Sequence, residues 1–364
     1  MSLPTIGPDV GCEQSVPLAV ALDAIAGFAP EAERLERSGV TEADVRRLAS
    51  VGVMTVGGGN EFSPAQEREI QEQLAAASGA LWFVSAQHRS PAVAAQNTSN
   101  RALRQRYADG LASGALLGAV SFAHLRRAKP TVVAERRGSG WTISGRLDWI
   151  TSWGVADVLL LMAETADSHV VQCLLPAQAR PGLDITGELS LAAMGGTSTV
   201  GAVLDGMTVA DSEVADVLPK SQWALSDAHR TANVPAAVVG IARAAVNALT
   251  ELASERSWAE LKALATEWSS HLIADRRRAY ELVDDVAPEE ALDERLALRG
   301  SVTKLAQDAT AMLVAAQAGR AVLTSSAAQR WSREAMFALV QAQTPVSRNA
   351  LIAAYRAGLS EAEG

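Results

Sequence analysis

The stretch that decides the fold is Trp141–Ser152, which reads WTISGRLDWITS. Its first half mixes branched, aromatic and hydroxyl residues, which are enriched in β-strands. Directly before it, Gly138-Ser139-Gly140 has the composition of a tight turn, and the apolar run Thr131–Ala134 precedes that turn. The sequence therefore predicts a β-hairpin whose second strand begins near Trp141.

Further short apolar runs follow this hairpin, each too short for a typical helix and bounded by turn residues. The runs are Val158–Met162, Val170–Leu175 and Gly201–Val209, and the turns include Arg180-Pro181-Gly182 and Asp205-Gly206. Their spacing predicts a compact β-domain over residues 119–225.

Helical periodicity frames the β-domain on both sides. Towards the N-terminus, Thr41 is placed to cap a helix that begins at Glu42, and Pro64–Ala77 reads as another helix. Towards the C-terminus, apolar residues recur at spacings of three and four along two long segments. The two stripes are Val238, Val239, Ala242, Ala245, Val246, Leu249, Leu252 and Ala253, then Val302, Leu305, Ala306, Ala309, Met312, Leu313 and Ala316. Their many alanines allow the close packing of an antiparallel bundle.

The order of these segments predicts an α+β protein that is mainly α. We expect an N-terminal helical domain over residues 1–118, a middle β-domain over 119–225 and a C-terminal four-helix bundle over 226–364. Strands and helices separated in this way exclude Rossmann and TIM-barrel folds, in which the two alternate throughout.

Composition narrows the functional classes. The chain has 364 residues, 48% hydrophobic and 20% charged, with a formal net charge of −9. A nucleic-acid-binding protein needs a basic surface, and the densest basic run, Arg276-Arg277-Arg278, reads as the solvated face of a helix. The sequence has no run of eighteen uncharged apolar residues, so it does not predict a membrane span. No leader pattern is visible at the N-terminus. We expect neither nucleic acid nor a membrane as a partner.

Cysteine and histidine usage bears on metals and on location. Only Cys12 and Cys173 are present, and the five histidines lie far apart in the sequence. No zinc-type spacing such as Cys-x-x-Cys occurs. We therefore expect no structural metal, and the cysteine usage is typical of a cytoplasmic protein.

The deciding stretch resembles the acyl-CoA dehydrogenase family. That family carries a strand with Gly-x-Lys-x-Trp-Ile-Thr-[Asn/Ser] and then Ala-Asp, and this chain has Gly145–Ser152 followed by Ala156-Asp157, with Leu147 where Lys is commonest. Other segments match the family in the expected order: Met194–Thr199, Val203–Val209, Gly240–Ala245, Glu255–Glu260 and Arg330–Ala335. The resemblance thus spans nearly the whole chain.

The resemblance implies a flavoprotein that uses FAD. It places Trp149 flat against the flavin ring, Thr151 within hydrogen-bonding reach of flavin N5 or a neighbouring carbonyl, and Ser152 beside them. It carries Arg256 to the cofactor of a neighbouring subunit. We expect the alanine-rich bundle to bury an apolar face by self-association into a homodimer or homotetramer. The residues alone also allow a plainer interpretation, with Trp149 and Thr151 in the core of a strand and Arg256 in a surface ion pair.

One departure from the family concerns the phosphates of the cofactor. The family's loop Thr-Glu-Pro-x-x-Gly-Ser-Asp should precede the deciding strand, but the chain has the basic segment Ser121–Pro130 there. Small residues that let backbone N–H groups approach phosphates are therefore missing. Arg126, Arg127 or Lys129 could supply positive charge instead, or they could be solvated loop residues.

Another departure concerns the catalytic base. Removing the proton alpha to a thioester needs a carboxylate, and such a base contributes about 10²–10⁴-fold to the rate. The common family position falls on Ala342 and the alternative position on Arg230, and neither side chain can act as a carboxylate base. The catalytic residue is therefore unknown, and a glutamate from elsewhere, such as Glu213 or Glu334, stays an open alternative.

These observations leave several functional hypotheses. The leading one is an FAD-dependent oxidoreductase that resembles acyl-CoA dehydrogenases but has altered chemistry, acting on a small molecule such as an acyl-CoA. An alternative is a flavin-dependent monooxygenase of the same fold, which uses reduced flavin and oxygen and is less affected by the missing glutamate. The other alternative is a non-catalytic relative, acting as a binding protein or a partner subunit, which the altered phosphate loop favours.

Overall fold

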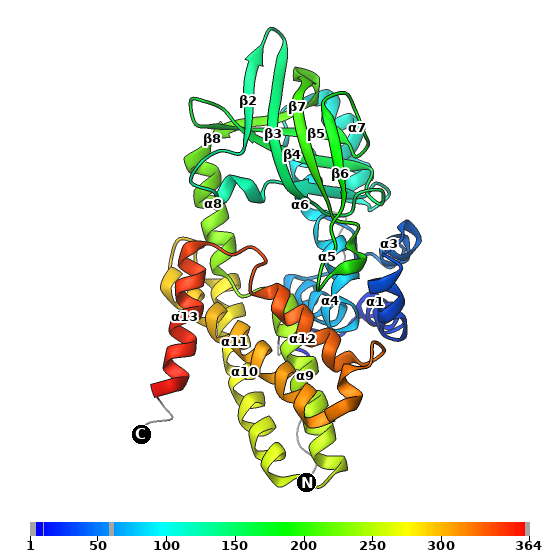
Figure 1. Ribbon diagram of the computed structural model, residues 1–364, viewed down its shortest axis with the longest axis vertical. Coiled ribbons are helices and arrows are strands. Elements are labelled where there is room, and N and C mark those ends of the chain that lie inside the picture. Colours follow the sequence, from blue (N-terminus) through cyan, green and yellow to red (C-terminus); the bar gives the residue numbers. More distant parts are fainter. Residues whose placement is uncertain (1–4, 10, 58–61, 361–364) are drawn as a thin grey trace. The chain divides into compact units, whose positions relative to one another are not determined.

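The structure of the protein is a computed structural model that describes residues 5–9, 11–57 and 62–360 (Figure 1). Helices come first along the chain, strands follow, and helices return to the C-terminal end. This order confirms the fold class expected from the sequence.

Two of the N-terminal helices, α3 Glu42–Ala49 and α4 Pro64–Ala77, begin directly after residues that cap them. Thr41 caps α3 as predicted, since its hydroxyl accepts from the Asp44 N–H at 3.3 Å and the Asp44 carboxylate accepts from the Thr41 N–H at 2.8 Å. Ser63 and Gln66 form the same reciprocal cap at the start of α4. The elements are α1 Val16–Ala26, η1 Ala29–Glu31, α2 Ala32–Arg37, α3 Glu42–Ala49, α4 Pro64–Ala77, α5 Gly79–Ala86, α6 Arg89–Asn97 and α7 Arg101–Ala112.

The middle of the chain forms one eight-stranded sheet in the order β6-β7-β3-β2-β4-β5-β8, with β1 pairing in parallel with β4. The strands are β1 Gly118–Ser121, β2 Val132–Arg137, β3 Gly140–Ile150, β4 Val158–Glu164, β5 His169–Pro176, β6 Leu183–Glu188, β7 Val200–Ala210 and β8 Val214–Pro219. Short 3₁₀ turns lie between them: η2 Ala123–Arg126, η3 Gly195–Thr197 and η4 Asp211–Glu213.

The predicted hairpin is present as β2 and β3. Arg137 pairs with Gly140 across a two-residue turn, and Gly138 in that turn has a φ of +56°, which glycine adopts without steric cost. The sequence prediction missed β1, β6 and β8, because these strands are short and partly polar and so lack a clear apolar run.

Strand β4 is buried along its whole length and serves two cores. Leu159, Leu161 and Ala163 belong to the core on one face of the sheet, together with the inward residues of β3 and β7. Val158, Leu160 and Met162 belong to the other core, with apolar residues of α6 and α7. The alternation of β-strand side chains explains why every residue of this run is apolar except its last.

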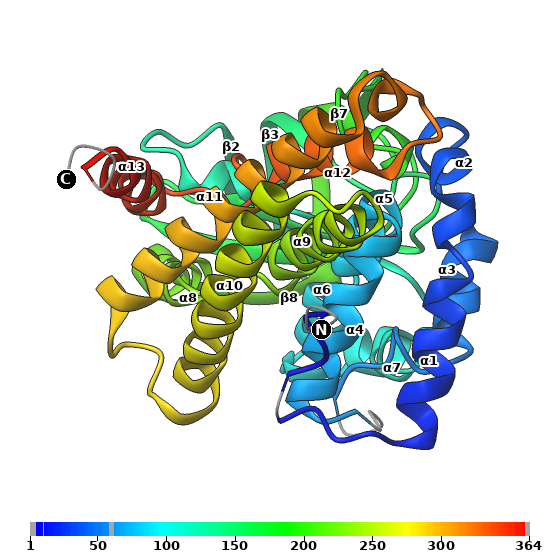
Figure 2. The ribbon, with the colours of Figure 1, turned by 90° about the horizontal axis from the view of Figure 1, so that it is seen from below.

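The C-terminal helices pack around α9. They are α8 Lys220–Ala232, α9 Ala236–Glu255, α10 Ala259–Asp285, α11 Leu292–Gln317, η5 Ala318–Val322, α12 Ala327–Ala338 and α13 Pro345–Ser360. Helix α9 lies beside α4, α10, α11 and α12 (Figure 2). The stretch Lys220–Glu255 contains an 18-residue window apolar enough for a membrane span, but 72% of that window is buried inside the protein, as in a core helix of a bundle.

The chain folds into two compact units, and their boundaries differ from those between its helical and its β segments. A helical unit consists of residues 1–18, 62–79 and 227–364, and a sheet unit consists of residues 19–61 and 80–226. Helix α4 therefore belongs with the C-terminal bundle, while most of the other N-terminal helices belong with the sheet. The three domain boundaries drawn from the sequence stay a prediction.

Candidate functional site

The end of β3 presents a large aromatic side chain to solvent. Trp149 is 47% exposed, although Leu147 and Ile150 on the same strand are fully buried. The pairing of β3 with β7 shifts register between Leu147 and Ile150, so that Asp148 and Trp149 both lie away from the core. The Ser121 hydroxyl donates to the Trp149 carbonyl at 3.2 Å and fixes this irregular backbone to the end of β1.

Thr151 follows Trp149 by two residues and is buried. Its hydroxyl is 3.1 Å from the Thr199 hydroxyl, which in turn is 2.7 Å from the Thr197 hydroxyl. Thr197 closes the chain by donating to the Met194 carbonyl at 2.8 Å. This row of hydroxyls ties the end of β3 to the segment before β7, so Thr151 holds the backbone on which Trp149 is displayed.

Ser152 lies in the turn that follows β3 and is buried. Its φ of +69° lies in the left-handed region, and its N–H donates to the Thr197 carbonyl at 3.0 Å. Among the described residues its buried hydroxyl has no hydrogen-bond partner. The hydroxyl lines a small cavity that also contacts His88 and Val155. Ser152 is therefore a supporting residue of the turn.

His88 in that cavity is held neutral by its surroundings. The Gly118 N–H donates to Nδ1 at 3.2 Å, so Nε2 carries the proton and donates to the Leu111 carbonyl at 2.8 Å. Burial lowers the pKa of His88 below its ordinary value. The lowered pKa favours the neutral ring, whose two nitrogens are both used in contacts within the sheet unit.

The basic segment after β1 reaches the end of β3. Arg127 forms an ion pair with Asp148, and Arg146 Nε lies 3.8 Å from the other oxygen of the same carboxylate. Beneath them, His124 is buried and its Nε2 is 2.9 Å from the Met162 carbonyl. Arg127 and Arg146 therefore approach Asp148 from two different elements.

The positions that the resemblance assigns to the bundle are held in structural contacts. Arg256 lies at the C-terminal end of α9 and donates to the Ala316 carbonyl at 2.9 Å. Arg230 lies on α8, which ends before α9 begins, and pairs with Asp227 at 2.6 Å. Ala342 has a φ of +51°, and its carbonyl accepts from Arg299 at 3.3 Å.

The two glutamates left open as alternative bases are engaged elsewhere. Glu213 pairs with Arg180 at 2.8 Å, which helps to hold its pKa below the ordinary value. Glu334 is buried, pairs with Arg330 at 3.1 Å and accepts from the Gly79 N–H at 2.9 Å. Glu334 thus caps the start of α5, where the helix dipole favours a negative charge.

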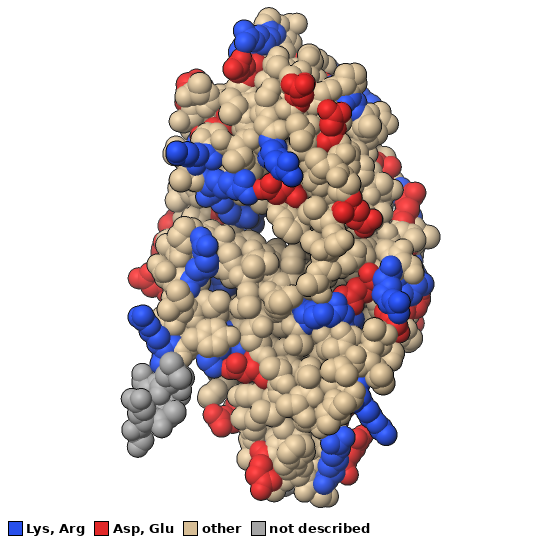
Figure 3. Space-filling model, viewed as in Figure 1, with Lys and Arg blue, Asp and Glu red and all other residues tan. Residues whose placement is uncertain are grey.

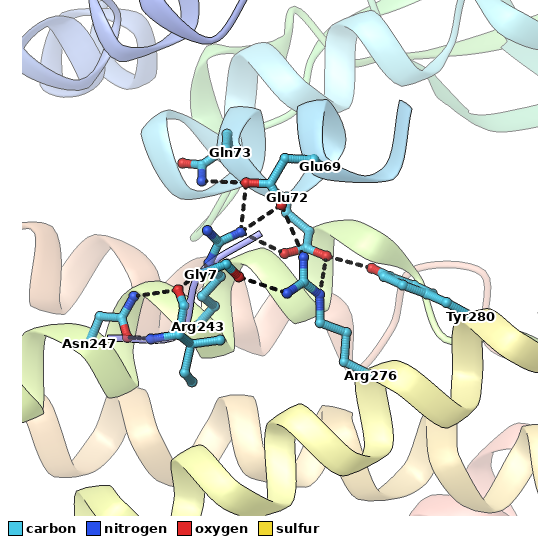
Figure 4. Close-up of polar contacts among 9 residues, drawn as sticks. Gly7, Glu69, Glu72, Gln73, Arg243, Asn247, Arg276 and Tyr280 are labelled. Atoms are coloured by element: carbon cyan, nitrogen blue, oxygen red, sulfur yellow. Dashed lines mark hydrogen bonds and ion pairs between the residues drawn. The ribbon is translucent and has the colours of Figure 1, made fainter. Parts of the chain in front are cut away.

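Sequence reasoning missed a buried ion-pair cluster in the helical unit (Figure 4). The cluster consists of Glu69 and Glu72 on α4, Arg243 on α9, and Arg276 and Tyr280 on α10. Arg243 Nη1 donates to both oxygens of Glu69, at 2.8 and 2.9 Å, and to Glu72 at 3.0 Å. Arg276 donates to Glu72 at 2.8 Å and to Glu69 at 3.0 Å. Two carboxylates and two guanidinium groups cancel in charge.

The position of Arg276 corrects the expectation of a solvated basic run. Its side chain is 4% exposed, and it follows Leu272 by one helical turn on the buried face of α10. Consecutive helical residues point in directions about 100° apart, so three adjacent arginines cannot share one face. The i, i+3 spacing places Glu69 and Glu72 on one face of α4, but the polar residues around them give no sign that this face is buried.

The cluster also holds the segment near the N-terminus. Arg243 donates to the Ile6 carbonyl and Arg276 to the Gly7 carbonyl, each at 2.9 Å. A cavity of about 240 Å³ lies beside these contacts, and Gln73 and Asn247 are among the residues that line it. The charged groups at this cavity are already bonded within the protein, so the arrangement is that of a structural anchor.

Comparisons with known proteins agree with this architecture. The chain is similar to butyryl-CoA dehydrogenase from Megasphaera elsdenii, with a TM-score of 0.79 and 17% identity over 95% of this chain and 99% of that one. It is also similar to glutaryl-CoA dehydrogenase from Mycobacterium smegmatis in complex with FADH2, with a TM-score of 0.76 and 16% identity over 95% of each chain. The chain therefore has the acyl-CoA dehydrogenase fold, and the resemblance drawn from its sequence is confirmed at that level.

The similarity in sequence to a curated protein covers less of the chain than the similarity in structure does. Mitochondrial isovaleryl-CoA dehydrogenase from Pongo abelii is 24% identical over 190 residues, which are 47% of this chain and 45% of that protein. The match thus spans less than half the length of this curated relative. No protein-family model matches the chain.

Proposed function

We propose that the protein is a flavoprotein that holds FAD against the end of β3 and acts as an oxidoreductase. The observation that carries the proposal is the 47% exposed indole of Trp149, displayed on a strand whose neighbouring apolar residues are buried. An exposed aromatic surface of this kind is a platform on which a planar ring can stack. The acyl-CoA dehydrogenase fold supports the choice of a flavin as that ring.

The residues at the strand end fit the ring of the cofactor. Trp149 offers the flat surface, while Thr151 and the hydroxyl row behind it keep the backbone in place. The Thr151 hydroxyl has three hydrogen-bonding positions and uses one on Thr199, which leaves capacity for another partner. FAD when bound would supply the acceptor for two electrons from the substrate.

The chemistry we propose differs from ordinary acyl-CoA desaturation. Neither Ala342 nor Arg230 can remove a proton, and both lie in local structural contacts. Glu213 and Glu334 are committed to arginines. We therefore propose a small-molecule substrate, with an acyl-CoA as one candidate, that is oxidised without a carboxylate base at the usual positions.

We also propose that the protein forms a homodimer or homotetramer. Several large apolar side chains near the C-terminal end of the helical unit are exposed, which is costly for a monomer in water. They are Val322, Leu323, Met336, Val340, Val346, Ile352 and Tyr355. Light scattering at micromolar concentration tests this point, and a monomer would contradict it. A cytoplasmic location stays a prediction; both cysteines are free and buried.

The test of the proposed function is the absorbance spectrum of protein purified with added FAD. We expect a bound flavin spectrum and quenching of FAD fluorescence on titration. Trp149→Ala should weaken FAD binding about tenfold, because stacking on the indole is lost. Trp268→Ala on α10 is the control and should leave FAD affinity unchanged.

One specific observation favours a second candidate, a non-catalytic relative. Segment Ser121–Pro130 has no glycine that would let its backbone approach a phosphate. If the wild-type protein shows neither flavin absorbance nor quenching at any FAD concentration, the oxidoreductase is excluded and this second candidate stands. Oxygen consumption with reduced flavin would instead favour the monooxygenase alternative.

A further inference from the structure

Positive charge gathers beside the exposed indole in the sheet unit. The segment after β1 carries Arg126, Arg127 and Lys129, and Arg146 lies on β3 three residues before Trp149. Asp148 is the carboxylate that pairs with Arg127 and Arg146. Figure 3 shows Lys and Arg side chains gathered on this unit, with Asp and Glu side chains close by. Arg127 and Arg146 thus bring two guanidinium groups to one carboxylate at this strand end.

Arg127 and Arg146 each contact Asp148 and still expose much of their side chains to solvent. Both contact Asp148, from the loop and from the strand respectively. Their side chains remain 49% and 67% exposed. A guanidinium group has five N–H donors in a planar fork. Each arginine therefore keeps donors directed to solvent while Asp148 restrains its position.

The charge of Arg127 also affects the pKa of the buried His124 ring. The pKa of His124 is lowered to about 4, mainly by burial, and the charges of Arg127 and Lys220 lower it further. The opposing effect of Asp148 is smaller. Lys220 itself forms an ion pair with Glu164.

We propose that Arg127 and Arg146 bind the phosphate groups of the flavin nucleotide that stacks on Trp149. The inference rests on the proposed function and adds a phosphate site that uses arginine side chains in place of a loop of small residues. Planar guanidinium groups match phosphate oxygens two at a time, which a lysine cannot do. Asp148 serves as the positioning residue that keeps both arginines beside the indole.

A flavin series tests this site, because its members differ only beyond the ring system. Riboflavin has no phosphate, FMN has one, and FAD has a diphosphate. We expect the wild-type protein to bind FAD and FMN more tightly than riboflavin, with a preference that weakens as salt is added. The double variant Arg127→Gln/Arg146→Gln should lose about tenfold to a hundredfold in affinity for FAD and FMN and keep its riboflavin affinity.

The matched control is Arg136→Gln/Arg137→Gln at the other end of the same hairpin. Arg136 pairs with Asp211 and Arg137 with Glu135, and both arginines are as exposed as those of the proposed site. This variant should bind all three flavins as the wild type does. Equal FAD affinity in the two double variants would overturn the phosphate site while leaving the flavin proposal intact. Failure of the wild type to bind any of the three flavins would overturn both.

Discussion

Two regions of the molecule use arginine and carboxylate side chains in opposite ways. In the buried ion-pair cluster of the helical unit, both carboxylates and both guanidinium groups are almost fully removed from water and each is bonded to several partners. At the strand end of the sheet unit, Arg127 and Arg146 share Asp148 and remain about half or more exposed. The same residue types thus form buried structural contacts in the helical unit and exposed ion pairs in the sheet unit.

The difference in burial between the two regions indicates which residues contribute to stability and which are available for binding. Removing one partner from a buried pair leaves the other charge uncompensated, which is costly, whereas an exposed pair contributes little. Exposed donors, by contrast, are available to a ligand. We therefore expect changes in the cluster to affect unfolding, and changes at the strand end to affect binding.

The largest expected effect is that of Arg276→Met. This change keeps most of the side-chain volume but removes donors from Glu69, Glu72 and the Gly7 carbonyl. We expect the free energy of unfolding to fall by about 3–5 kcal/mol. Urea unfolding followed by circular dichroism measures the loss.

Arg127→Met is the matched change at the strand end and should cost less than about 1 kcal/mol, because its ion pair is solvent-exposed. Similar losses for the two variants would remove the distinction between the buried and the exposed region. A stable Arg276→Met protein would mean that the two carboxylates take up protons or water without cost.

A further prediction concerns pH and the sheet unit. His124 has a pKa of about 4 in the folded protein against an ordinary value of 6.5. Between these values the unfolded chain binds a proton that the folded protein does not, so stability falls as the pH drops from about 6.5 towards 4. The loss should approach about 3 kcal/mol below pH 4.

His124→Gln supplies the control for this pH effect. Glutamine keeps an N–H that can donate to the Met162 carbonyl but has no titration in this range. The stability difference between wild type and variant should therefore change with pH only between about 6.5 and 4. His88, whose pKa is also lowered, contributes equally to both proteins and cancels in that difference. A difference that does not vary with pH would contradict the lowered pKa of His124 in the folded protein.

Much of the fold was predictable because it rests on local patterns. Thr41 caps its helix, and the Gly138-Ser139 turn joins β2 to β3, since both depend on neighbouring residues alone. The cluster was not predictable in this way, because Glu72 and Arg276 are joined only when distant helices pack together. A charged residue in a helix gives no local sign that its partner lies two hundred residues away.

In the candidate site too, local sequence identified residues, whereas their arrangement depends on contacts between distant segments. The motif named Trp149, Thr151 and Ser152 as candidates, but it could not show that the indole is exposed while Thr151 and Ser152 are buried. That arrangement depends on the register shift between β3 and β7. Likewise, Arg127 could be named as a candidate, but its link to Asp148 required the fold.

A smaller effect is expected where α4 crosses α9 next to the cluster. A Cβ at Gly240 would lie 2.1 Å from the backbone carbonyl oxygen of Glu72, so Gly240→Ala must push the two helices apart. We expect a cost of about 1–3 kcal/mol, typical of overpacking. Gly319→Ala is the control, because nothing lies within 4 Å of its Cβ position. Equal stability of the two variants would show that the α4–α9 contact yields easily.

The smallest effect concerns the turn behind the indole, and its sign is opposite. Ser152 combines a φ of +69° with a buried hydroxyl that has no hydrogen-bond partner among the described residues. Ser152→Gly relieves both, and we expect the free energy of unfolding to rise by about 1 kcal/mol after the greater freedom of glycine in the unfolded chain is counted. Thermal unfolding measures the change. Ser168→Gly is the control for the backbone part alone, since Ser168 has a φ of +61° but is exposed. If Ser152→Gly lowers stability while Ser168→Gly does not, the Ser152 hydroxyl is bonded to a water in the cavity beside His88, and the strand end is supported by solvent as well as by its row of threonines.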